Sequence, residues 1–231
     1  PQRQMASSMA AACEGWKTRV ETAEGRQAFG EAAAELDVDI DDHAHASGGT
    51  LINELRAIAH EVGDATALAA SDSKFELLHS HLVDYWRQHP GKKVVLFSFY
   101  RATLYYLQRR MASDGIQAVV LHGGMDKQQA LEHFERADGP HILLSSEVAS
   151  EGVDLQFSSL LINYDLPWNP ARIEQRIGRI DRIGQQEEQI LIWNLVYEDS
   201  IDDRVYERLL DRLGAFRQAL GSWRTSSSRI G

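Results

Sequence analysis

The stretch that decides the fold is NYDLPWNPARIEQRIGRIDRIGQ, which runs from Asn163 to Gln185. The apolar run LLI at residues 160–162 precedes its turn and is typical of a buried strand. That strand ends before Pro167, because the residue ahead of a proline is biased toward extended or turn conformations. Pro170 suits a first helical position, where its missing N–H costs nothing. The sequence therefore predicts a strand, a turn and a helix in immediate succession.

The predicted helix carries apolar and basic side chains at helical spacing. Ile173, Ile177 and Ile180 can form one buried stripe. Four arginines lie among them, the last three spaced by three residues: Arg172, Arg176, Arg179 and Arg182. A solvated basic face is the ordinary interpretation of such a run. Gly178, however, costs a helix up to about 1 kcal/mol relative to alanine and adds nothing to solubility. We therefore favour a functional interpretation of this helix.

Strand-like and helical patterns alternate on both sides of this stretch. Strands are predicted at residues 92–98, 115–121, 141–145, 160–164 and 189–196. Helices are predicted between residues 72 and 90 (with Phe75, Leu78, Leu82, Val83 and Trp86 inward), and at 99–111, 126–136 and 200–220. Such alternation indicates an α/β fold, in which a parallel sheet is covered by helices on both faces. Functional residues are then expected at the carboxyl ends of the strands.

The chain divides into three parts by composition. Residues 1–71 are predicted to be a helical N-terminal appendage with an acidic loop at residues 36–50, residues 72–221 a compact lobe, and residues 222–231 a tail. The formal net charge is −10, from 24 basic and 34 acidic residues. Proteins that only coat nucleic acid are normally basic, so this balance disfavours a simple packaging role but allows a local binding patch.

Cysteine, histidine and apolar content set further bounds. The one cysteine, Cys13, excludes an intramolecular disulfide and fits a reducing, cytoplasmic environment. No apolar run approaches the roughly 18 residues that a membrane span needs. His43 and His45 have no second ligand pair at matching spacing, so no metal site is predicted. A chain that starts at Pro1 suggests a fragment of something longer.

Residues 175–182, QRIGRIDR, resemble the arginine motif QRxGRxxR of superfamily-2 helicases. The continuation RIGQ at residues 182–185 and the segment RQMASS at residues 3–8 are similar to the Swi/Snf-type branch, and most like its bacterial RNA-polymerase-associated (RapA/HepA-like) subgroup. The resemblance implies a RecA-like C-terminal motor lobe. It also implies that Arg179 and Arg182 reach the phosphates of ATP across a cleft, with Gln175 beside the nucleotide. A guanidinium suits that role, since it binds phosphate oxygens bidentately and stabilises charge in phosphoryl transfer.

Residues 146–154, SEVASEGVD, are similar to the superfamily-2 motif TDVAARGxD. The resemblance implies that Ser146 contacts the nucleic-acid backbone, that Gly152 permits a close approach near the nucleotide, and that Asp154 holds a ribose hydroxyl. The sequence departs from the pattern at Glu151, where related helicases often have arginine. The role of Glu151 is therefore open.

Two further stretches match the family at strand ends. Ser98, after the first strand, would offer a hydroxyl to a nucleic-acid phosphate, and the turn at His122 and Gly123 resembles the family's HG turn. Glycine lets backbone approach phosphate closely, and phosphate contacts position a strand without reading its sequence. Asp165 could order one of the arginines and so couple the nucleotide and DNA sites.

Two motifs of a complete ATPase are missing from the sequence. There is no GxxxxGK[ST] loop and no acidic box that would hold a metal ion. The resemblance therefore implies the second lobe of a double-stranded-DNA-dependent ATPase and translocase that uses ATP with Mg2+, the Mg2+ held mainly by an N-terminal lobe. The fragment alone would be inactive. Implied partners are double-stranded DNA, that lobe, and RNA polymerase or a phage-defence complex, in a nucleoid-associated location. Two alternatives remain: a lobe of a strand-separating DNA or RNA helicase, and a non-catalytic RecA-like binding module.

Overall fold

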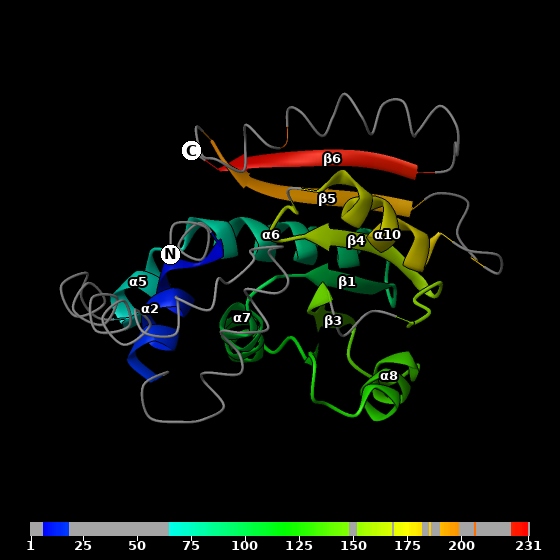
Figure 1. Cartoon of the computed structure of the whole chain (residues 1–231), viewed down its shortest axis with the longest axis horizontal. Helices are drawn as coiled ribbons and strands as arrows, with labels where there is room; N and C mark the ends of the chain where they lie inside the picture. Colours follow the sequence, from blue (N-terminus) through cyan, green and yellow to red (C-terminus); the bar gives the residue numbers. More distant parts are fainter. Residues whose placement is uncertain are drawn as a thin grey trace, which may run out of the picture.

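The sheet is built from six strands that all run parallel. The computed structural model describes residues 7–18, 65–147, 152–167, 169–181, 185, 190–198, 206 and 223–230. The strands are β1 (Lys93–Phe97), β2 (Ala118–Leu121), β3 (Ile142–Ser145), β4 (Ser158–Asn163), β5 (Ile190–Tyr197) and β6 (Trp223–Ile230). Their order in the sheet is β2-β3-β1-β4-β5-β6 (Figure 1). This confirms the α/β, RecA-like fold that the alternating pattern predicted.

Several of the described helices begin at a capping side chain. They are α2 (Met9–Thr18), α5 (Ala65–Ala70), α6 (Ser73–Gln88), α7 (Arg101–Ser113), α8 (Lys127–Glu135) and α10 (Pro170–Ile180). Asp72 accepts the Phe75 N–H at the start of α6, and Asp126 accepts the Gln129 N–H at the start of α8. Asn169 caps α10, with Pro170 in the first turn. Each cap satisfies an amide that the helix itself leaves unbonded.

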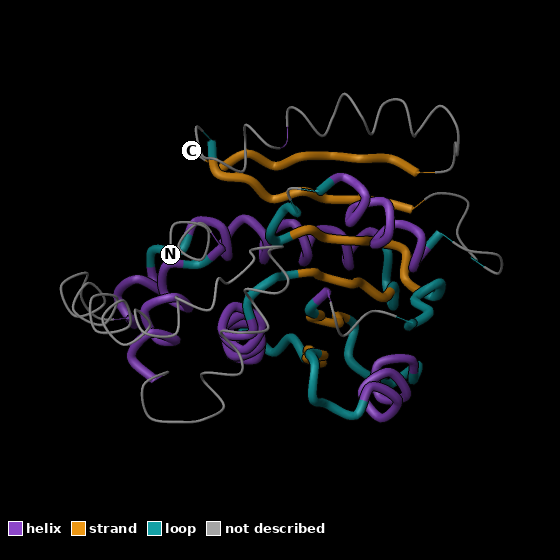
Figure 2. The backbone as a smooth tube through the Cα atoms, viewed as in Figure 1, coloured by secondary structure: helices purple, strands orange, loops and turns teal. Residues whose placement is uncertain are grey.

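Helices lie around the strands of the sheet (Figure 2), and alternate residues of the strands face two separate cores. Val95 and Phe97 point to one face, which the isoleucines of α10 and Phe134 of α8 cover. Val94 and Leu96 point to the other face, against α6 and α7. The strands are apolar on both sides because both faces are covered, as a parallel sheet requires.

The N-terminal helix packs on the second of these faces. Ala10 and Ala11 of α2 are buried in the same core as α6 and α7. Ser7 bonds Thr103 through their hydroxyls at 3.0 Å, and the Ser8 hydroxyl donates to Asp72 at 3.2 Å. Residues 7–18 are therefore joined to the lobe by apolar and polar contacts.

Two expectations about individual segments are wrong. Val83 is 36% exposed, whereas Leu82 is fully buried. Adjacent residues of a helix point in different directions, so the two cannot share one core. The tail predicted at residues 222–231 contains β6, which pairs with β5 over its whole length. Its serine-rich sequence gives little strand signal, and the unpaired groups at the edge of β5 supply the reason to pair.

Other predicted segments lie outside the described residues. These are the acidic loop at 36–50, most of the rest of the helical appendage at 1–71, and the helix at 200–220 apart from Tyr206, which is helical. No described helix is long and apolar enough to cross a membrane.

Candidate functional site

Five of the residues singled out from the sequence line the carboxyl edge of the sheet. In the order of the strands they are His122 and Gly123 after β2, Ser146 after β3, Ser98 after β1 and Asp165 after β4. Backbone bonds continue the sheet into this edge: the Ser146 N–H donates to Leu121, that of Ser98 to Ser145, and that of Tyr164 to Phe97. Parallel pairing thus gathers residues that are up to 67 positions apart in the chain.

Asp165 holds the end of β1 in place. Its Oδ2 accepts the Ser98 hydroxyl at 2.5 Å and the Phe99 N–H at 3.1 Å. The Nζ of Lys74, which is 1% exposed, lies 3.9 Å from Oδ1. Ser98 is fully buried and bound to Asp165, so the carboxylate and the hydroxyl form one unit. The phosphate contact of Ser98 and the coupling role of Asp165 stay predictions.

His122 sits in a fixed hydrogen-bonding frame with a defined tautomer. Its Nδ1 lies 2.7 Å from the Gly123 carbonyl, which can only accept, so Nδ1 carries the proton. In the neutral ring Nε2 then accepts from the Tyr105 hydroxyl at 2.7 Å. Arg101 donates to the same Gly123 carbonyl at 2.7 Å.

The charge state of His122 follows from this frame. Burial lowers the pKa of His122, and nearby Arg101 lowers it further, while the bond to the Gly123 carbonyl opposes them. Tyr105 is 40% exposed beside it. Arg101 and Tyr105 were not singled out from the sequence, because a helix start and an exposed aromatic carry no motif of their own.

Arg176 is the buried arginine of the α10 helix, and no role was predicted for it. Its guanidinium is 2% exposed. One nitrogen donates to the Asn163 side-chain oxygen at 2.6 Å and to the Asp165 carbonyl at 3.2 Å. The Asn163 amide nitrogen donates in turn to Asn194 at 2.8 Å, which turns the Asn163 oxygen toward Arg176.

Glu147 completes the surroundings of Arg176. Its Oε2 accepts from the second nitrogen of Arg176 at 3.0 Å and lies 3.6 Å from a nitrogen of Arg172. The Arg176 guanidinium lies 5.0 Å from the ring centre of Phe97 and 5.2 Å from that of Phe99. The signal for this burial is that Arg176 directly precedes Ile177 at the margin of the apolar stripe. Glu147 directly follows a strand-end residue.

The proposed nucleotide-facing residues of α10 lie farther from the apolar stripe. Gln175 is exposed and Arg179, one turn later, is partly exposed. Gly178 is exposed, and a Cβ built on it would meet nothing within 4 Å. Arg182 lies outside the described residues.

The end of the SEVASEGVD segment lies against the end of α10. The Leu155 N–H donates to the Arg179 carbonyl at 3.0 Å. Asp154, the preceding residue, is exposed, and so is Gly152. Gly152 has a φ of 75°, in the left-handed region that favours glycine. The Leu155 bond thus brings the exposed carboxylate of Asp154 and the left-handed Gly152 to the end of α10 that carries Arg179. Such groups suit a nucleotide.

A further question for this site is whether protein side chains could hold a metal ion. Within the described ranges, no three or more His, Cys, Asp or Glu side chains cluster as metal ligands. His43 and His45 lie outside those ranges.

A comparison with protein families and a comparison with curated proteins both find similarity to helicases. Residues 73–184 match the model of the helicase conserved C-terminal domain. The chain is 38% identical over 131 residues to an uncharacterised ATP-dependent helicase, YqhH, of Bacillus subtilis strain 168. The match covers 56% of this chain and 23% of the relative, so the chain spans less than a quarter of that protein's length.

Solved structures share the fold at low sequence identity. The C-terminal part of the Fun30 ATPase domain aligns with a TM-score of 0.55 and 17% identity, over 90% of this chain and 85% of that one. The C-terminal domain of S. cerevisiae Dbp5 aligns with a TM-score of 0.50 and 20% identity, over 68% and 83% of the two chains. The E. coli DEAD-box protein SrmB gives 0.50 and 22%, over 68% and 84%.

Proposed function

We propose that the chain, whose residues 73–184 match the model of the helicase conserved C-terminal domain, is the second RecA-like motor lobe of a Swi/Snf-type, double-stranded-DNA-dependent ATPase of the RapA/HepA-like subgroup. The parent would translocate along duplex DNA. The QRIGRIDR and RIGQ residues support the Swi/Snf branch. A first lobe would supply the phosphate-binding loop and most of the Mg2+ ligands, neither of which this sequence carries.

The observation that carries this proposal is the meeting of the two nucleotide-motif segments. Leu155, which follows the SEVASEGVD segment, is bonded to the carbonyl of Arg179 in the arginine motif. In this proposal Gly152 permits a close approach near the nucleotide, Asp154 holds its ribose hydroxyl, and Arg179 reaches its phosphates. Gln175 lies beside the same nucleotide. Bound ATP supplies the phosphoryl group. Arg179 and Arg182 stabilise the negative charge that its transfer develops.

The neighbouring strand ends suit a nucleic-acid backbone. His122 and Gly123 form an open turn that Arg101 supports from α7. Ser98 and Ser146 lie farther along the same edge. Contacts from such residues position a duplex without reading its sequence, as a translocating motor needs. In a cytoplasmic, nucleoid-associated parent of this subgroup, RNA polymerase or a phage-defence complex would be the further partner.

The second candidate is a lobe of a strand-separating helicase. It is favoured by the similarity over 131 residues to a protein named an ATP-dependent helicase. A strand-displacement assay on a forked duplex separates the two. Displacement by the parent would favour the helicase, and ATP-driven movement without displacement would favour the translocase.

The test of the proposed function is ATP hydrolysis by the full-length parent, with and without duplex DNA. We expect duplex to stimulate hydrolysis, and Arg179→Ala and Arg182→Ala each to lower the rate about 10³-fold, as for other arginine fingers. Arg87→Ala is the matched control, because Arg87 is 71% exposed and paired only with Asp84 within the described part of α6. The chain by itself is expected to hydrolyse no ATP. An inactive parent, or fingers whose loss changes nothing, would leave the binding module as the better description.

A further inference from the structure

The proposed roles leave one deeply buried charged side chain of the lobe, Arg176, unused. Arg176 is 2% exposed and receives no substrate in the proposed function. Its contacts nevertheless come from three strand ends: Glu147 after β3, Asn163 and Asp165 at the end of β4, and the rings that flank the end of β1. Because these partners come from different strand ends, Arg176 fixes the position of α10 relative to those ends.

These contacts attach the SEVASEGVD segment to α10 at both of its ends. Glu147, near its start, binds Arg176 at 3.0 Å and lies 3.6 Å from Arg172. Leu155, just past its end, binds the Arg179 carbonyl at 3.0 Å. The segment and the helix are therefore fixed relative to each other at two points. The residues between carry Gly152 and Asp154, and the helix carries Gln175 and Arg179.

Stability alone does not require a charged pair at this place. Apolar side chains of similar volume often stabilise a core as well as a buried ion pair or better. What a guanidinium adds is direction, because its planar fork bonds acceptors only along fixed lines. Bonds to Glu147 and to Asn163 thus fix the rotation of α10 about its axis. That rotation also sets the direction in which Arg179 points, three residues farther on.

We propose that Glu147 and Arg176 are positioning residues, which hold α10 and the SEVASEGVD segment in one fixed relation so that Arg179 and Asp154 meet the same nucleotide. The inference rests on the proposed function. The Arg176 bond to the Asp165 carbonyl extends the relation to the nucleic-acid side, since the Asp165 carboxylate holds Ser98. Neither positioning residue touches substrate.

The experiment uses the full-length parent with Glu147→Gln, Arg176→Met and the double variant. Methionine fits the space between Phe97 and Phe99, because a thioether packs well against aromatic rings. The exposed pair Arg136 and Asp138, 2.8 Å apart, is the matched control, with Arg136→Met and Asp138→Asn. Each protein is assayed for its unfolding midpoint, and for kcat and KM of duplex-stimulated ATP hydrolysis below that midpoint.

We expect each single variant to lower kcat at least about 30-fold with less than about a threefold change in KM, since a misplaced finger loses contacts made only in the transition state. The control variants keep both constants. The double variant should regain most of the unfolding midpoint, because it leaves no unpaired charge, and yet keep the low kcat. A single variant that does not fold leaves the double variant to decide.

Recovery of kcat together with the midpoint would overturn the inference, because Glu147 and Arg176 would then serve folding alone. Folded single variants with unchanged kcat would overturn it as well, provided that Arg179→Ala is inactive in the same parent. A parent without duplex-stimulated hydrolysis, or one indifferent to Arg179→Ala, would reject the proposed function, and this inference with it.

Discussion

Asp165 and His122, at the carboxyl edge of the sheet, are held in place by hydrogen bonds, and these bonds limit how each side chain can react. Asp165 accepts two donors on one oxygen, and His122 uses both ring nitrogens. A proton that binds His122 must take the Nε2 position that now accepts from Tyr105. Protonation of His122 is therefore measurable as a change in its pKa and in stability.

The His122 ring gives the prediction at this scale. Burial and nearby Arg101 lower the pKa of His122. NMR titration should thus find it below the usual value of about 6.5, and Arg101→Gln should raise it. Between the folded pKa and about 6.5 the unfolded chain binds more protons, so this contribution to stability is lost as the pH falls through that window.

The control variant for this titration is Arg87→Gln, because Arg87 is 71% exposed on α6 and is bonded to Asp84. It should leave the pKa of His122 unchanged, because no contact joins Arg87 to His122 in the described structure. A His122 pKa above the usual value, or one that Arg101→Gln leaves unchanged, would contradict the hydrogen-bonding frame.

Elements were easier to predict than the directions of their side chains. The five apolar runs became β1 to β5, and Asp126 became the cap of α8, because period and capping are local properties of the sequence. The site residues at strand ends followed from parallel pairing. The place of Arg176 beside Ile177 marks the margin of the apolar stripe, but its burial was not predicted, since it depends on acceptors at the ends of β3 and β4 that lie far from α10 in the sequence. The pairing of β6 depends in the same way on a distant edge.

The α10 helix gives the prediction at the scale of elements. Gly178 has exposed, helical backbone, and a Cβ there would meet nothing within 4 Å. The fold therefore has no need of glycine, and Gly178→Ala should stabilise the chain by about 0.5–1 kcal/mol in urea unfolding. If bare backbone is there to let the first lobe approach, the same variant should lower duplex-stimulated hydrolysis in the parent.

Ala171→Gly reverses the exchange at an exposed position of the same helix and should cost stability without the effect on hydrolysis. A Gly178→Ala parent that is more stable and fully active would show that the glycine has no part in closure. A less stable one would mean that an alanine side chain at position 178 is not accommodated as the structure indicates.

At the scale of the molecule, the two faces of the sheet carry different helices. One face holds α8 and α10, and with them the arginines of the proposed nucleotide site. The other holds α2, α6 and α7 around one core. Asp72 and Lys74 at the start of α6 join this second face to the carboxyl edge, since Lys74 lies against Asp165. The N-terminal segment, predicted as an appendage, therefore bonds through Ser8 to the start of α6, the same stretch whose Lys74 lies against Asp165.

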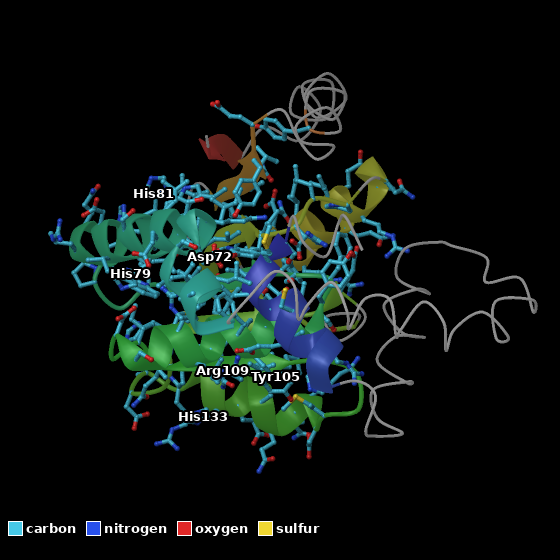
Figure 3. All side chains as sticks on the ribbon, turned by 90° about the vertical axis from the view of Figure 1, so that its left-hand side faces the viewer. Asp72, His79, His81, Tyr105, Arg109 and His133 are labelled. Atoms are coloured by element: carbon cyan, nitrogen blue, oxygen red, sulfur yellow. The ribbon has the colours of Figure 1, made fainter. Side chains whose placement is uncertain are left out.

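Asp72, labelled in Figure 3, lies at the start of α6 and gives the prediction for the whole molecule. Its carboxylate accepts the Phe75 N–H at 3.0 Å, the Tyr106 hydroxyl at 2.9 Å and the Ser8 hydroxyl at 3.2 Å. It thereby joins α6, α7 and the N-terminal segment. Asp72→Ala should cost about 3 kcal/mol of unfolding free energy, from a lost cap of about 1 kcal/mol and two buried donors left without an acceptor.

Asp126→Ala is the matched control, because Asp126 is exposed and, in the described structure, its side chain caps α8 alone. It should cost only about 1 kcal/mol. Hydrogen exchange should also separate the two variants: Asp72→Ala should speed exchange of the α2 amides, whereas Asp126→Ala should leave them protected. Equal costs, with α2 protected in both, would mean that apolar packing of Ala10 and Ala11 holds the N-terminal segment. Asp72 would then be no more than a helix cap.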